Sequence, residues 1–209
     1  MVYYRLAIMS KDGDWIVRET EDACRRIRGV LAERGARYRP GAPLDPRWLA
    51  GGWSSHFELT DTAGRRVRCD FFSRPPRVSR RWLEELFSDP EPRDLDVVDV
   101  ASLIRMKQTQ RAKDYPVIGE LARLLPPEQE LELTTDPDRI LELAPRFGAA
   151  SERPAVRAAF SDGPRLAVVQ ALAVEIDRLQ QQDRRRVEEI RMGGRAVPRG
   201  LPKARPQSP

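Results

Sequence analysis

Two short segments with alternating apolar and polar side chains constrain the fold of this chain most strongly. Residues 53–59 (WSSHFEL) and 66–72 (RVRCDFF) are joined by the turn-forming run DTAGR, which is typical of a β-hairpin. Alternation puts the apolar side chains of both segments on one face of the hairpin and most polar side chains on the other. Because directly opposed residues share a face, a dry core requires Phe57 to lie opposite Cys69. The register of the hairpin is therefore predicted from the sequence.

That register places charged side chains across from one another on the polar face. The only histidine of the chain, His56, lies opposite Asp70, and Glu58 lies opposite Arg68. One interpretation is a solvated face with two surface ion pairs, each contributing about 0.2 to 1 kcal/mol. The other is that the imidazole and the carboxylate form an acid/base pair or a pair of metal ligands. Both interpretations stay open at this point.

Apolar periodicity and turn residues predict further strands and a series of helices. A first strand is expected over residues 2–9, followed by a turn that contains Asp12 and Asp14. A brief strand over residues 94–100 is expected to end in a helix capped by Asp99. Helices are expected over residues 15–34, 80–87 and 100–110, from about 114, in short segments at 136–144 and 153–160, and over 164–190.

These elements predict an α+β protein with a small mixed β-sheet flanked by helices and a C-terminal helical extension. The expected division is an α+β domain at residues 1–125, a helical extension at 126–191 and a disordered basic tail at 192–209. With two cysteines, no apolar run of membrane-spanning length and no signal peptide, the chain is expected in the cytoplasm without a membrane partner. The net charge of +5 and the pI of about 9.6 favour polyanionic partners. The oligomeric state is left open.

Two stretches of the sequence are similar to a known family. The run VRCDFFSRPPRV (67–78) and the run VVDVASLIRMKQTQRAKDYPVIGELARLL (97–125) resemble the nucleotidyltransferase superfamily with the DNA-polymerase-β-like fold. The resemblance covers roughly residues 2–125 and is closest to small bacterial abortive-infection-type or uncharacterised members. It implies that Asp70 is the third carboxylate of a magnesium site and that Lys107 lies near the phosphates of a nucleoside triphosphate.

The residue types suit that chemistry. Hard Mg²⁺ binds carboxylate oxygens and neutralises charge on a triphosphate, and a lysine acts on phosphates as a point charge. The candidate catalytic residues are thus Asp70, Lys107 and His56, with Asp70 as the candidate metal ligand. The resemblance assigns nucleotide binding to Lys107 together with Arg111 and Lys113 at the following turn.

The sequence departs from the family at the first strand. Active members carry an Asp-x-Asp pair there, whereas the strand expected over residues 2–9 contains no acid, and Asp12 and Asp14 are expected in a turn. The resemblance therefore implies an incomplete metal site. The first hypothesis is accordingly a nucleotide-binding or regulatory relative of the active enzymes. A second hypothesis is an active Mg²⁺-dependent nucleotidyltransferase acting on a protein, RNA or small molecule, with a rearranged acid set or residues encoded upstream of Met1. A third is a nucleic-acid-binding module that uses the basic tail.

Overall fold

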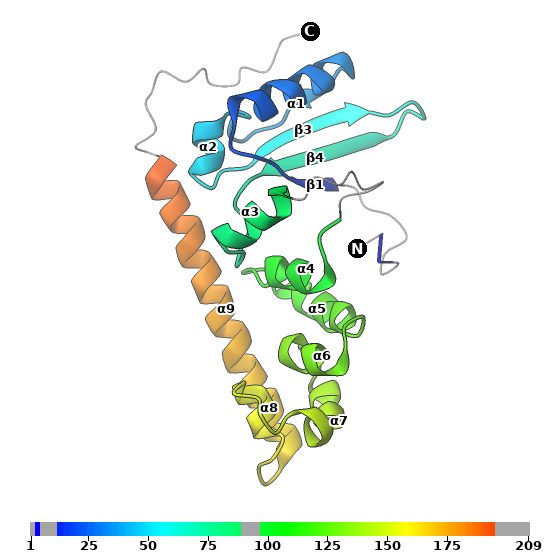
Figure 1. Cartoon of the computed structure of the whole chain (residues 1–209), viewed down its shortest axis with the longest axis vertical. Helices are drawn as coiled ribbons and strands as arrows, with labels where there is room; N and C mark the ends of the chain where they lie inside the picture. The colour runs from blue at the N-terminus through cyan, green and yellow to red at the C-terminus, as the bar shows by residue number, and fades with distance from the viewer. Residues whose placement is uncertain (1–2, 5–11, 89–96, 195–209) are drawn as a thin grey trace. The chain divides into compact units, whose positions relative to one another are not determined.

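The chain folds into two compact units. The computed structural model describes residues 3–4, 12–88 and 97–194 (Figure 1). Within these ranges, the first unit extends to Pro75 and also includes the end of the chain's last helix from Val187, while the second unit runs from Pro76 to Arg186. The predicted domain boundary at residue 125 stays a prediction. Asp70 and Lys107 belong to different units.

The first unit is built on a four-stranded mixed sheet with the order β1-β4-β3-β2, of which Figure 1 labels β1, β4 and β3. The strands are β1 (Asp12–Ile16), β2 (Arg37–Tyr38), β3 (Ser55–Thr60) and β4 (Arg66–Phe72). β1 runs parallel to β4, while β3 is antiparallel to both β4 and β2. The predicted α+β class and mixed sheet are confirmed. The finer assignment to a nucleotidyltransferase-like fold stays a prediction.

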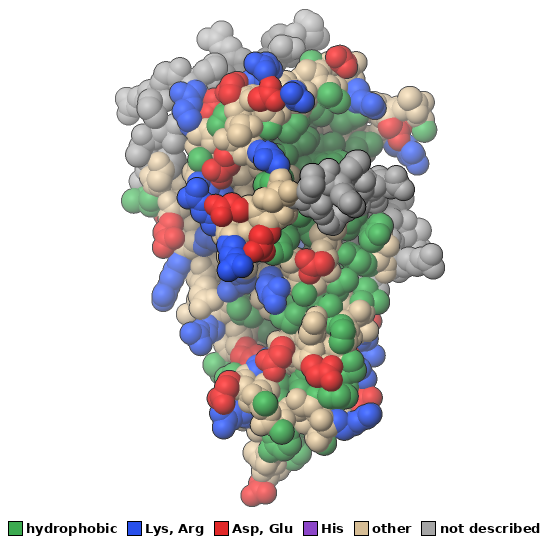
Figure 2. All heavy atoms as spheres, in the orientation of Figure 1, with side chains coloured by type: hydrophobic (Ala, Val, Ile, Leu, Met, Phe, Trp, Pro, Cys, Tyr) green, Lys and Arg blue, Asp and Glu red, His purple; other side chains and the backbone are tan. Residues whose placement is uncertain are grey.

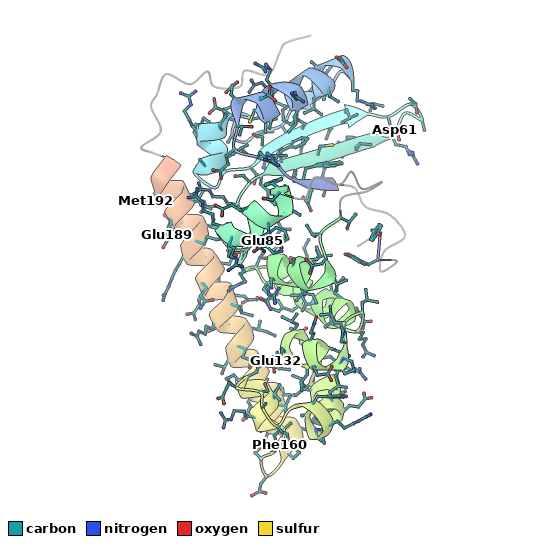
Figure 3. The ribbon with its side chains drawn as sticks, in the orientation of Figure 1. Asp61, Glu85, Glu132, Phe160, Glu189 and Met192 are labelled. Carbon is teal, nitrogen blue, oxygen red and sulfur yellow. The ribbon has the colours of Figure 1, made fainter. Side chains whose placement is uncertain are left out.

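The predicted hairpin register is confirmed. Phe57 pairs with Cys69, and His56 pairs with Asp70. At the tip of the hairpin, Asp61 accepts hydrogen bonds from the backbone N–H groups of Ala63 and Arg65, both at 2.9 Å (Figure 3). This turn closes the two strands and so fixes which side chains oppose each other.

One face of the sheet is apolar and lies against α1 (Glu21–Glu33), as Figure 1 shows. The buried core of this unit consists of Cys24, Leu31, Leu44, Leu49, Phe57 and Phe71. Thr20 caps the start of α1, because its side chain accepts a hydrogen bond from the N–H of Ala23. The helix ends before Gly35, which has a φ of 64°. The short helix α2 (Pro46–Ala50) is capped at its start by Asp45.

The first strand differs from the prediction. Asp12 and Asp14 were expected in a turn, and Trp15 and Ile16 in the following helix, but all four belong to β1. The Asp-Gly pair favours a turn locally, whereas pairing with β4 gives this segment a complete set of backbone hydrogen-bond partners on one side. The helix predicted from residue 15 therefore begins only at Glu21.

The second unit is helical. Its elements are α3 (Arg80–Ser88), α4 (Val100–Lys107), the 3₁₀ turn η1 (Ala112–Asp114), α5 (Tyr115–Ala122), α6 (Pro127–Leu133), α7 (Pro137–Phe147), α8 (Pro154–Ala158) and the greater part of α9 (Pro164–Gly194). Its core is made by Leu131, Ile140, Leu143, Ala144, Ala155, Val156, Val168 and Leu172. Around α6, α7 and α8, Figure 2 shows acidic and basic side chains scattered among hydrophobic ones. Within the described residues, no helix combines the length and the apolar character needed to cross a membrane.

Most predicted helices are confirmed, with small changes at their ends. Asp99 caps α4 by accepting a hydrogen bond of 2.8 Å from the N–H of Ser102. α4 stops at Lys107 rather than at residue 110. The predicted strand over 2–9, the start of the brief strand over 94–100 and the tail from residue 195 lie outside the described residues, apart from a turn at Tyr3 and Tyr4. Val98 and Asp99 adopt no strand conformation.

Candidate functional site

The face of the sheet opposite α1 carries polar side chains from all four strands. We call this surface the polar face, and its charged or titratable members are Asp12, Asp14, Arg37, Arg39, His56, Glu58, Arg66, Arg68 and Asp70. Opposed residues form rows that cross the strands, because partners in a sheet point to the same side. One row runs from Asp14 through Asp70 to His56, and it continues to Arg39, whose N–H donates to the carbonyl of His56 at 2.8 Å.

The histidine and the acid predicted to face each other are in direct contact. His56 Nδ1 lies 2.8 Å from Asp70 Oδ1, and the two side chains are 31% and 26% exposed. A carboxylate oxygen accepts hydrogen bonds, so Nδ1 of His56 is the donor in this contact and Nε2 is the ring nitrogen that remains for a further partner. The backbone of Gly41 packs against the ring so closely that a Cβ there would lie 2.7 Å from the Cδ2 atom of His56. The imidazole is therefore held between Asp70 and the chain at Gly41.

A second acid lies next to Asp70 in the sheet. Asp14 on β1 is the direct partner of Asp70 on β4, and the two strands are parallel neighbours. Asp12 lies two residues earlier on the same face and its Oδ1 is 3.8 Å from Nη1 of Arg68. Strands in a sheet are about 4.8 Å apart, so β1 presents an Asp-x-Asp pair directly beside the strand acid.

Sequence reasoning missed this arrangement. The segment DGDWI does alternate between acids on one side and Gly13 and Trp15 on the other, which is a weak strand signal. The turn preference of Asp and Gly outweighed it. The pairing of β1 with β4 joins segments more than 50 residues apart, and no local pattern reports such a contact.

The donor types suit a hard divalent cation, but the side chains do not converge as a closed site. Asp12, Asp14 and Asp70 offer carboxylate oxygens, the ligands that Mg²⁺ prefers. Among the residues that the structure describes, however, no group of three or more His, Cys, Asp or Glu side chains is placed so that it could hold a metal ion. A cation at this face would have to draw the carboxylates together from their present rotamers.

The other end of the polar face is basic. The Glu58 Oε2 atom lies 3.9 Å from Nε of Arg39, 3.6 Å from Nε of Arg66 and 3.6 Å from Nε of Arg68. Arg37 pairs with Glu58 across β2 and β3 and so belongs to the same face. We call Arg37, Arg39, Arg66 and Arg68 the arginine cluster. The polar face thus changes from acidic on β1 to basic on β2.

The three basic residues assigned to nucleotide binding lie around one loop of the second unit. Lys107 is the last residue of α4, Arg111 immediately precedes η1, and Lys113 lies within η1. The structure does not bring them together with Asp70 in one compact unit. Their assigned role stays a prediction.

The backbone of the loop between Lys107 and Arg111 is held at three consecutive residues. The carbonyl of Gln108 accepts from Arg77 Nε at 2.8 Å, and the carbonyl of Thr109 accepts from the hydroxyl of Tyr115 at 2.8 Å. The N–H of Gln110 donates to Oδ2 of the buried Asp183 on α9 at 3.0 Å. These contacts fix the geometry of the loop within the second unit.

Comparisons with known proteins add no family assignment. No protein-family model matches the chain, and it has no significant match among the curated proteins or the solved structures. A functional proposal therefore depends on the geometry of the polar face and on the resemblance of residues 67–78 and 97–125.

Proposed function

We propose that the chain is a Mg²⁺-dependent nucleotidyltransferase that binds a nucleoside triphosphate at the acidic end of the polar face. The observation that supports this most directly is the register of β1 with β4, which sets Asp14 beside Asp70 and Asp12 on the same face. The resemblance calls for an Asp-x-Asp pair on a strand next to the strand that carries the third acid. The segment expected as a strand over residues 2–9 has no acid, whereas β1 carries such a pair beside Asp70. This observation favours the active enzyme over the incomplete relative.

Each polar residue has a proposed role. Asp12, Asp14 and Asp70 would hold Mg²⁺, which would neutralise charge on the triphosphate and its leaving pyrophosphate. His56 would accept the proton of the acceptor hydroxyl at Nε2, while the Asp70 carboxylate at Nδ1 orients the ring and stabilises the imidazolium. Lys107, Arg111 and Lys113 belong to the second unit, and phosphate binding by these three side chains stays the role that the resemblance implies for them.

A nucleotide-binding protein without transferase activity is the second candidate. It is favoured by the 2.8 Å contact that commits one Asp70 oxygen to His56, and by the lack of a three-residue ligand group in the described part of the chain. In that case the acidic end of the polar face would hold the nucleotide without activating an acceptor. Binding and transfer must therefore be measured separately.

Binding is tested by thermal unfolding of the full chain with each of ATP, GTP, CTP and UTP, in Mg²⁺ and in EDTA. A ligand present at 100 times its Kd stabilises the native state by about 2.7 kcal/mol, which is a readily measured rise in Tm. We expect the triphosphate to raise Tm in the presence of Mg²⁺ but not in EDTA. We expect Asp14→Asn and Asp70→Asn to abolish this rise. Asp22→Asn, on the exposed surface of α1, removes the same charge and should leave it unchanged. If no triphosphate raises Tm, or if the three variants behave alike, the proposal is wrong.

Transfer is tested by incubating the protein with an α-phosphate-labelled triphosphate, Mg²⁺ and fractionated cell RNA, protein or small molecules. Label should appear in one acceptor fraction, with pyrophosphate released in equal amount. His56→Gln should slow this transfer while leaving the nucleotide-induced rise in Tm in place, because the imidazole acts on the acceptor. Nucleotide binding with no labelled product in any fraction would identify the non-catalytic relative instead.

A further inference from the structure

We infer that the arginine cluster is a second ligand site, which binds the phosphodiester backbone of a single-stranded nucleic acid. The site consists of Arg37 on β2, Arg39 directly after β2, and Arg66 and Arg68 on β4, grouped around Glu58. The inference extends the proposed function, since a strand bound beside the acids would be the acceptor. The site itself is argued from charge, donor geometry and extent, and none of these depends on nucleotide chemistry.

The cluster carries more positive charge than the fold requires. Among the described residues, four guanidinium groups face two carboxylates on this part of the polar face, those of Glu58 and Asp12. Surface ion pairs contribute about 0–1 kcal/mol each, so one arginine is enough to balance Glu58, and further ones add little stability. Arg66 keeps 64% of its side chain exposed and Arg39 keeps 36%. The excess charge is therefore open to an anion from solvent.

The guanidinium groups also keep hydrogen-bond donors for a ligand. Their closest approaches to Glu58 are 3.6 to 3.9 Å, longer than the 2.7–3.2 Å of a hydrogen bond. Each guanidinium presents five N–H donors in a planar fork, which matches two oxygens of a phosphate group. A phosphate could thus replace the loose contacts with Glu58 by direct hydrogen bonds.

The spacing of the cluster favours a ligand with several phosphates. Arg39 lies opposite His56, Arg68 lies opposite Glu58, and Arg66 lies opposite Thr60, so the cluster occupies three successive rows. Rows are two residues apart, which is about 6.7 Å, and the cluster extends over about 13 Å along the strands. A single phosphate contacts one or two of these side chains, whereas a polynucleotide backbone can contact all of them.

Charge also defines where such a strand can lie. Asp14 and Asp70 repel phosphates from the β1 side of the polar face, so the backbone is restricted to β2, β3 and the first half of β4. The net charge of +5 attracts polyanions to the protein as a whole. The end of a strand held there would point its hydroxyl group toward the row of His56 and Asp70.

The test measures binding of a fluorescent 12-nucleotide single strand to the full chain in EDTA, without nucleotide, between 50 and 200 mM salt. The affinity should fall steeply with salt, because each neutralised phosphate contributes about 0.7 to the slope of log K against log salt concentration for single strands. Arg39→Ala combined with Arg66→Ala should reduce that slope by about 1.4 and weaken binding at 50 mM salt by 10-fold or more. Arg25→Ala combined with Arg26→Ala, on the exposed surface of α1, removes equal charge and is the matched control.

Substitution of Glu58 gives a result that a purely structural network would not give. Glu58→Gln removes the repelling carboxylate from the centre of the cluster, so we expect binding to tighten several-fold. If the arginines serve only to neutralise Glu58, this variant would not bind the strand more tightly. The inference would be overturned if the double variant of Arg39 and Arg66 bound the strand as tightly as the control double variant of Arg25 and Arg26. It would also be overturned if pyrophosphate bound the protein as tightly as the strand does and displaced it.

Two further variants separate this site from other proposals. Replacing Arg195, Arg199, Lys203 and Arg205 by Gln should leave most of the affinity for the strand in place. If this variant lost binding while the variant of Arg39 and Arg66 kept it, the strand would bind to the tail and not to the arginine cluster. Asp14→Asn should not weaken strand binding in EDTA. A protein that binds the strand through the cluster but no Mg²⁺–triphosphate would refute only the proposed function. The reverse pattern would refute only the nucleic-acid site.

Discussion

Replacing Arg139 by methionine should destabilise the second unit strongly, because it leaves a buried acid without its partner. Arg139 on α7 donates from Nε and Nη2 to the two carboxylate oxygens of Glu130 on α6, both at 2.7 Å. The side chain of Glu130 is only 3% exposed, whereas the side chain of Arg139 is 21% exposed and also reaches Glu142. The pKa of Arg139 is raised by these hydrogen bonds, so the guanidinium stays charged at any pH used for unfolding.

The expected loss can be estimated from the burial of the two partners. Breaking a buried ion pair by removing one member costs about 3–5 kcal/mol, since the remaining charge stays in a poorly solvated place. The partial exposure of Arg139 lets some water reach the pair, which puts the expected loss near the lower end, about 3 kcal/mol. For a chain of this length, that corresponds to a fall in Tm of about 6–12 °C.

The asymmetry in burial makes a double-mutant cycle informative. Glu130→Met should cost less than Arg139→Met, because the stranded guanidinium still reaches Glu142 and solvent. The double variant should recover most of the stability, since methionine side chains of similar length replace both charges with apolar contacts. Thermal and urea unfolding followed by circular dichroism would give all three values.

Two results would refute this reasoning. If Arg139→Met unfolded within 2 °C of the parent protein, Glu130 would not be held in a poorly solvated place. If the losses of the two single variants simply added in the double variant, the two side chains would not be coupled.

Two further predictions concern the fold. Burial raises the pKa of the Tyr38 and Tyr115 phenols and of the Cys24 and Cys69 thiols, so all four groups stay protonated in the folded state. Their contribution to stability is complete below the unfolded pKa values, about 8.5 for cysteine and about 10 for tyrosine, and is lost as the pH rises through the higher folded values, so Tm should decline progressively above about pH 8.5. Gly148→Ala should lower the free energy of unfolding of the second unit by about 1–3 kcal/mol, measured by urea unfolding. The new Cβ would lie 2.8 Å from the carbonyl oxygen of Ala144 and 2.9 Å from Cγ1 of Val156, which is too close without a shift of the backbone. Unchanged stability would mean that α7 and α8 separate freely.

Local patterns in the sequence were sufficient for the hairpin. Phe57 and Cys69 have to share the apolar face, and a slip by one residue would put every charged side chain of the strand into the core. The contact between His56 and Asp70 follows from that single requirement, and the structure confirms it at 2.8 Å. Helix periodicity and the cap at Asp99 were sufficient in the same way, because capping depends on groups within four residues.

The full polar face depends on pairings that no local pattern encodes. The segment from Asp12 to Ile16 is too short and too rich in turn-forming residues to be recognised alone, and it becomes a strand because β4 offers it a row of unpaired backbone groups. The two-residue strand β2 likewise has no signal of its own, yet it carries Arg37 and brings Arg39 into the arginine cluster. Strand order thus determines which charged side chains lie together on the polar face and which remain separate surface groups. Strand order is a property of the tertiary structure, since it is set by the burial of the apolar face against α1 and not by the residues of any one strand.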